Sequence, residues 1–145
     1  MNNILYSFLY AWAKLHGVLP MRILYILSDL FYIIIYKLAG YRLKVVRKNM
    51  KKAFPDKSAE ELKKLEQEFY HHFCDYVVET LKLSHISLEE VQRRAYLSNP
   101  ELVDDLMEKG HTTFILLMGH YGNWEWFSAS SSRVKSARVY QIYRP

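Results

Sequence analysis

The chain has 145 residues, of which 50% are hydrophobic and 15% aromatic, with a formal net charge of +5. This length suits one domain with a hydrophobic core. The low numbers of glycine (5) and proline (4) exclude a collagen-like chain or a Pro/Gly-rich disordered one. A single cysteine, Cys74, excludes an internal disulfide and is typical of a reducing compartment.

The positive charge is concentrated in the first part of the chain. Residues 1–55 contain nine Lys/Arg and one acid, whereas residues 56–145 contain eleven Lys/Arg and fourteen acids. A basic block beside apolar residues indicates an anionic membrane surface. Nucleic acid is the competing partner for such a block, but the sequence contains no recognisable nucleic-acid module, so we expect no nucleic acid to bind.

The first predicted elements are two apolar helices. The opening stretch MNNILYSFLYAWAKLHG has no basic leader and only a short, broken apolar run, so we expect it to be retained rather than cleaved as a signal peptide. Pro20 and Gly40 then frame a second helix over residues 21–38. At 1.5 Å per residue it is about 27 Å long, barely a membrane span.

The second helix is amphipathic. Arg22, Asp29 and Lys37 fall within an arc of about 80° on a helical projection, and tyrosines lie beside them. Three arrangements fit: the helix lies in the membrane interface, it spans the membrane with its polar stripe against protein, or it belongs to a soluble core. The following run, residues 37–55, has seven Lys/Arg and no acid, which favours membrane contact on the cytoplasmic side. An acidic protein partner is the alternative for this run.

The middle of the chain predicts three further helices. Ser58 stands three residues before Glu61, a capping-box pattern, and apolar residues at helical spacing then predict a helix to about Leu83. Ser87 and Glu90 repeat the pattern for a shorter helix. A third helix begins after residues 99–100 and closes at residue 110, which is glycine.

The segment TTFILLM, residues 112–118, predicts a strand buried on both faces, because it is β-branched and apolar without alternation. A second strand is expected at about 138–143 and a weak one at 95–98. With helices before and after the first strand, the sequence predicts an α/β fold in which helices flank a mixed sheet. We divide the chain into membrane-associated amphipathic helices, 1–55, and the beginning of an α/β domain, 56–145.

A polar turn follows the first predicted strand. Residues 117–126 read LMGHYGNWEW, and chemistry gathers at the carboxyl ends of strands in α/β folds. The glycines, including Gly122, permit a sharp turn and a close approach of substrate. We expect Asn123 to cap the next helix and Glu125 to lie in its first turn.

His120 and Glu125 are the candidate catalytic pair. A neutral imidazole takes a proton from a hydroxyl, and a carboxylate holds the other ring nitrogen and stabilises the imidazolium. Spacing alone is weak evidence, because His85 and Glu90 have the same five-residue offset without a strand or flanking glycines. The prediction therefore depends on the combination of strand, glycines, asparagine and glutamate.

The stretch GHYGNWE resembles the H-x4-[DE] block of the glycerolipid acyltransferase superfamily, in the form found in lipid A biosynthesis acyltransferases of the lauroyl/myristoyl type. The apolar N-terminal segment, RKNM at 47–50 and VYQIYRP at 139–145 also resemble that family. The resemblance implies an enzyme of the bacterial inner membrane, facing the cytoplasm. It would transfer an acyl chain from acyl carrier protein to a hydroxyl of a lipid A precursor or related glycolipid, in lipopolysaccharide synthesis.

The resemblance also implies roles for particular residues. His120 would be the general base and Glu125 its orienting partner. Gly122, Asn123 and Arg144 would contact substrate, with Arg144 near the phosphate or sugar head group of the acceptor. No cofactor and no metal is implied.

The resemblance implies a chain about twice as long, so we expect a truncated chain with an incomplete sheet: residues 56–145 would be the N-terminal part of the acyltransferase domain. Two other functions fit the residues. One is a non-catalytic, membrane-bound fragment that binds lipid or a partner protein. The other is a hydrolase in which His120 activates water.

Overall fold

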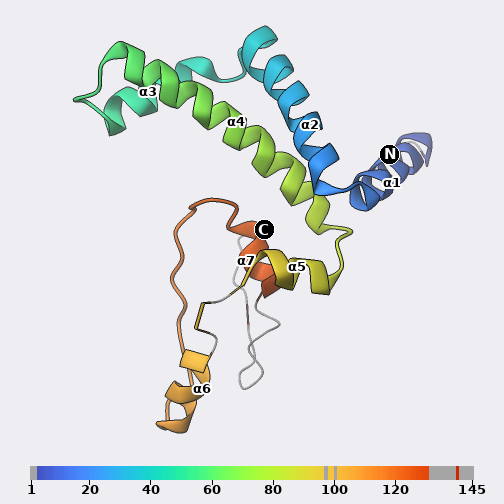
Figure 1. Cartoon of the computed structure of the whole chain (residues 1–145), viewed down its shortest axis with the longest axis vertical. Helices are drawn as coiled ribbons and strands as arrows, with labels where there is room; N and C mark the ends of the chain where they lie inside the picture. Colours follow the sequence, from blue (N-terminus) through green and yellow to red (C-terminus); the bar gives the residue numbers. More distant parts are fainter. Residues whose placement is uncertain (1–2, 97, 100, 131–139, 141–145) are drawn as a thin grey trace.

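The computed structural model describes residues 3–96, 98–99, 101–130 and 140. These residues are mostly helical (Figure 1). The helices in chain order are α1 (Asn3–Val18), α2 (Met21–Tyr32), the π-helix η1 (Ile33–Leu38), α3 (Leu43–Ala53), α4 (Ala59–Leu83), α5 (Leu88–Arg94), α6 (Glu101–Glu108) and α7 (Glu125–Ser130). The predicted helices at 21–38, from Ser58 to Leu83, and after Ser87 are confirmed.

The core is the seam between α2–η1 and the long helix α4, which lie side by side in Figure 1. Apolar contacts join the two helices at both ends of this seam. Leu24 packs with Val78 near the start of α2, and Tyr36 packs with Tyr70 and Cys74 near the end of η1. The rings of Tyr36 and Tyr70 stack with centroids 4.8 Å apart. Burial also raises the pKa of the Cys74 thiol, which keeps it protonated and unreactive.

Hydroxyl groups of α2 and η1 face α4 and donate to its carboxylates. Tyr25 donates to Glu79 over 2.7 Å, and Ser28 donates to Asp75 over 2.6 Å. These two hydroxyls of α2 therefore face protein, whereas the charged residues of the predicted polar stripe, Arg22, Asp29 and Lys37, are exposed.

The outward side of α2–η1 carries several large apolar side chains. Ile26 and Leu38 are 64% and 77% exposed, and other large apolar side chains of the two helices share this exposure. These are Ile23, Leu30, Ile33 and Ile34. The charged residues Arg22, Asp29 and Lys37 are exposed too, so this side is far more apolar than the solvent face of a water-soluble helix.

Glu66 of α4 anchors η1 and α3 together. It is 2% exposed and accepts hydrogen bonds from Arg47 at 2.6 Å, Tyr36 at 2.8 Å and Lys63 at 2.8 Å. These donors, with the Arg47 guanidinium contributing most, lower the pKa of the Glu66 carboxyl to about 2. A buried carboxylate is thereby fully compensated, as it must be to remain ionised.

Local signals set the helix boundaries. The predicted capping box is complete, since Ser58 Oγ accepts from the Glu61 amide and the Glu61 carboxylate accepts from the Ser58 amide. Ser87 caps α5 by accepting from the Glu90 amide. Gly40 adopts a positive φ of 59° after η1, a conformation in which glycine avoids steric cost.

The described helices differ in length and apolarity. No individual helix there combines the length and apolarity that a bilayer crossing requires. The pair Met21–Leu38 and Leu43–Ala53 meets the requirement jointly, but the two parts are bent by 92°.

The predicted α/β fold is wrong for the part of the chain that the structure describes, which contains no strand or sheet. Residues 112–118 have no regular structure and run from α6 back towards α7 (Figure 1). Ile115 and Leu117 are 85% and 89% exposed. A strand requires a neighbour for its backbone hydrogen bonds, and no described segment pairs with this one. The weak strand at 95–98 is absent at its described positions, and 138–143 lies outside the described residues except for Tyr140.

The Glu66 cluster predicts an acid-sensitive stability. Replacing Glu66 with Ala should lower the free energy of unfolding by about 1–3 kcal/mol at pH 7, because the buried Tyr36 hydroxyl loses its acceptor and the exposed Arg47 and Lys63 lose their ion pair. Since the folded-state pKa lies near 2 and the ordinary value near 4.5, this contribution is present above pH 4.5 and is lost as pH falls towards 2. Denaturant unfolding in detergent at several pH values measures both effects.

Glu68→Ala is the matched control, because Glu68 is an exposed carboxylate on the same helix. Equal stability losses in the two variants, with the same pH dependence, would contradict the role assigned to Glu66.

Candidate active site

The turn predicted to be catalytic, residues 119–124, lies between the irregular segment 112–118 and α7. It is called the catalytic turn below. Gly122 has a positive φ of 58°, so it supplies the sharp bend expected from the sequence. Chain neighbours aside, no atom of the described residues lies within 4 Å of the position that a Cβ would occupy at Gly119 or Gly122. Tyr121 is 92% exposed. The backbone of the turn is therefore open to a substrate.

Asn123 ties the turn to α4. Its side-chain amide donates to Glu79 Oε2 over 2.7 Å, while Glu79 Oε1 accepts from the Tyr25 hydroxyl over 2.7 Å. Burial, followed by the bond to Glu79, raises the pKa of Tyr25 to about 12, so it remains a donor at physiological pH. One carboxylate of α4 thus connects α2 with the catalytic turn.

The expected capping role of the Asn123 side chain is wrong. Its Oδ1 is buried without a hydrogen-bond partner, whereas a cap needs that oxygen to accept from an amide of the helix. The backbone carbonyl of Asn123 instead accepts from the Trp126 amide at 3.2 Å. The attraction of the Nδ2 group to the ionised Glu79 carboxylate, a charge-assisted bond, outweighs the neutral cap.

Glu125 occupies the first turn of α7, as predicted. Its Oε1 accepts from the hydroxyl of Tyr76 over 3.3 Å. Burial and then the charge of Glu125 raise the pKa of Tyr76, so this hydroxyl stays protonated and orients the carboxylate. Tyr76 and Glu79 are three residues apart on α4, and the two side chains together hold Glu125 and Asn123.

His120 is exposed and lies against Trp124, with ring centroids 4.7 Å apart in an edge-on arrangement. The indole restricts where the imidazole can turn, while the exposed face remains accessible to substrate. The pairing of His120 with Glu125 stays a prediction.

Trp126 anchors the helix that follows the turn. It is 8% exposed, and α7 packs against α5 and α4 (Figure 1). This burial fixes the direction of α7 and therefore of Glu125 at its start.

Some residues of the site were missed by reasoning from the sequence, namely Tyr25, Tyr76 and Glu79. The sequence held a clue to two of them, because residues three apart on a helix, such as Tyr76 and Glu79 on the predicted helix, share one face. Nothing in the sequence indicated their partner turn. The predicted substrate contact Arg144 lies outside the described residues.

The comparisons with known proteins identify the class of protein. The model of the family described as "Bacterial lipid A biosynthesis acyltransferase" matches residues 2–129. This match covers most of the chain, including the catalytic turn, so the chain belongs to the bacterial lipid A biosynthesis acyltransferase family. The family supports an acyltransferase activity on a glycolipid in general. No curated protein and no solved structure matches the chain significantly.

The bridge from α4 to the turn predicts a local effect of Glu79→Ala. Loss of a charge-assisted hydrogen bond costs about 1.5–3 kcal/mol, so the turn should open more often. Hydrogen exchange of the Trp126 and Phe127 amides, which bond within the turn, should quicken about tenfold or more.

Glu68→Ala again serves as the control on the same helix, and its exchange rates at these amides should equal those of the unaltered protein. Unchanged exchange in Glu79→Ala would show that the turn is held by other contacts.

Proposed function

We propose that the chain transfers a fatty acyl group from acyl carrier protein to a hydroxyl of a lipid A precursor or related glycolipid. The observation that carries this proposal is the exposed His120 in an open turn, at the position of a family's acyltransfer block. The family match supports the reaction class. Contacts of Tyr76 with Glu125 and of Glu79 with Asn123, and the burial of Trp126, support the turn and the start of α7, as a preorganised site requires.

In the proposed reaction, the neutral imidazole of His120 accepts the proton of the acceptor hydroxyl as its oxygen attacks the thioester carbonyl carbon. The tetrahedral intermediate then collapses, the carbon–sulfur bond breaks, and the leaving thiolate takes the proton from the imidazolium. Glu125 stabilises the imidazolium, and the Tyr76 hydroxyl holds the Glu125 carboxylate in place. The acceptor supplies the hydroxyl, so the protein needs no nucleophile of its own.

We also propose that the protein works on the cytoplasmic face of the bacterial inner membrane. The exposed Ile and Leu side chains of α2–η1 support this location, because they suit hydrocarbon better than water. The next helix, α3, carries five basic residues and no acid, which suits the anionic headgroups beside that hydrocarbon.

The enzymatic proposal is tested with His120→Ala in a transfer assay. Membranes containing the chain receive labelled acyl carrier protein and a lipid A precursor. The variant should lose about 10²–10⁴-fold in rate, the usual contribution of a general base, while circular dichroism and membrane binding stay unchanged.

His72→Ala is the matched control, because His72 is an exposed histidine on α4. The product must be an acyl ester; free fatty acid would identify water as the acceptor. Absence of transfer in the folded, membrane-bound parent chain would instead support a non-catalytic binding role.

The membrane proposal is tested by vesicle flotation of Lys48→Gln/Lys52→Gln. Each lysine near an anionic surface contributes about 1 kcal/mol, so binding to vesicles with phosphatidylglycerol should weaken about 30-fold. Binding to pure phosphatidylcholine should not change. Lys64→Gln/Lys109→Gln removes the same charge outside α3, and an equal loss in that control would contradict a specific role of α3.

A further inference from the structure

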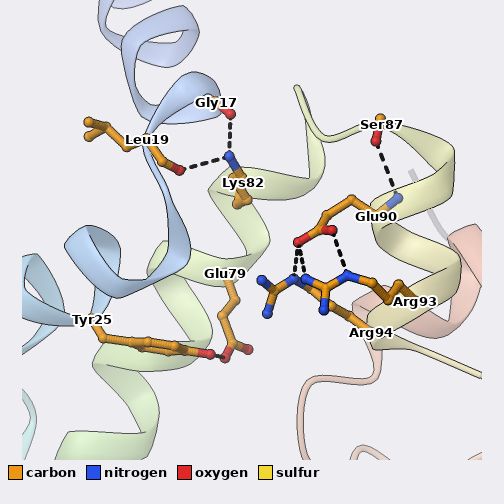
Figure 2. A network of polar contacts seen from close by, with 9 residues as sticks. All are labelled: Gly17, Leu19, Tyr25, Glu79, Lys82, Ser87, Glu90, Arg93 and Arg94. Atoms are coloured by element: carbon orange, nitrogen blue, oxygen red, sulfur yellow. Dashed lines mark hydrogen bonds and ion pairs between the residues drawn. The ribbon is translucent and has the colours of Figure 1, made fainter.

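A second site lies where the end of α1 and the start of α2 meet α4 and α5. A cleft of about 570 Å³ opens there, lined on one side by residues 17–22 and on the other by Lys82, residues 85–87 and the arginines of α5 (Figure 2). Its walls are in close contact at one point, because a Cβ on Gly17 would lie 2.1 Å from the Cβ of His85. The cleft is therefore set by direct packing of α1 against the turn after α4.

The positive charge of Lys82 is buried in this cleft without a carboxylate in contact. Lys82 is 8% exposed, and its ammonium donates to the backbone carbonyls of Gly17 and, at 2.9 Å, Leu19. Both partners are neutral. Burial lowers the pKa of the Lys82 ammonium, and an anion placed nearby would compensate this cost by stabilising the charged form.

The arginines add to this surplus. Arg93 and Arg94 share a single carboxylate, Glu90, which their guanidinium groups contact at 2.6–2.9 Å (Figure 2). Arg22 on the opposite wall forms no ion pair with any residue that the structure describes. Four cations thus line the cleft with one acid, a net charge of +3 before His85 is counted.

We infer that this cleft binds a phosphomonoester group. A phosphate dianion matches the surplus charge better than a single carboxylate does, and guanidinium groups from two walls can bind it through several oxygens. Arg22 and the outer nitrogens of Arg94 are the groups available to it. The Lys82 ammonium is already bonded to backbone carbonyls, so it would attract the phosphate through its charge rather than through a direct hydrogen bond.

The cleft and the turn both adjoin the last turns of α4. Lys82 lines the cleft, and Glu79, which accepts from Asn123 of the turn, lies three residues earlier on α4, about one helical turn away. Figure 2 shows Glu79 and Lys82 on this helix close to the arginines of α5. Resting on the proposed function, the phosphate would belong to the glycolipid acceptor, which this cleft would orient while His120 acts on its hydroxyl.

Isothermal titration calorimetry with the detergent-solubilised full chain tests the inference. The probes are inorganic phosphate, glucosamine 1-phosphate and unphosphorylated glucosamine. Both phosphates should bind, and glucosamine alone should not. Tighter binding of the sugar phosphate would assign the site to an acceptor phosphate, whereas equal binding would assign it to free phosphate.

Arg22→Gln and Arg22→Gln/Arg94→Gln should weaken phosphate binding about tenfold or more, because charged hydrogen bonds are lost. Lys64→Gln/Lys109→Gln, which removes the same charge elsewhere, should bind as the parent chain does. If the double variant unfolds, Arg22→Gln alone still tests the site, because Arg22 forms no ion pair with the described residues that the substitution would break. No binding of either phosphate, or equal weakening in the control, would overturn the inference.

A transfer assay separates this inference from the proposed function. His120→Ala should keep phosphate binding and lose transfer, whereas Arg22→Gln should raise KM for a phosphorylated acceptor and leave kcat nearly unchanged. Phosphate binding without any transfer in the parent chain would disprove the catalytic proposal and retain the site. Transfer with an unchanged KM in Arg22→Gln would overturn the acceptor assignment.

Discussion

The fold depends on hydroxyl groups of one helix donating to carboxylates of another. Three such pairs join α2–η1 to α4: Tyr25–Glu79, Ser28–Asp75 and Tyr36–Glu66. Hydrogen bonds to ionised groups are about twice as strong as neutral ones and fix geometry. Apolar contacts fill the seam between them, but the polar pairs set how the two helices align. The turn at residues 119–124 and the start of α7 are then held to α4 by Glu79 and Tyr76.

The same interaction extends from the core into the candidate site. Glu79 accepts from Tyr25 on one side and from Asn123 on the other, so the turn is attached to the helix pair that forms the core. Beyond Asn123, the Tyr76 hydroxyl reaches the Glu125 carboxylate. Support from α4, rather than from a sheet, is what positions the turn in the described part of the chain.

Local signals made the helices predictable, and the absence of a local signal explains the failures. Ser58 and Ser87 cap their helices as their sequence patterns indicated, because a cap involves residues only three apart. Local sequence could not decide whether residues 112–118 form a strand, because a strand requires a pairing partner that is distant in sequence. The same holds for Asn123, whose amide is drawn to Glu79, 44 residues earlier. The motif identified the turn and the bend at Gly122, but not what supports them.

The two sides of α2–η1 differ in how they tolerate substitution. Outward positions such as Ile26 and Leu38 are well exposed, so any apolar side chain of similar size serves there. Seam positions such as Tyr25 and Ser28 are each matched to one carboxylate, and a change at one of them demands a compensating change on α4. Evolutionary drift would therefore be free among the exposed aliphatic residues and restricted along the seam, where the hydroxyls are paired and Leu24 is fully buried.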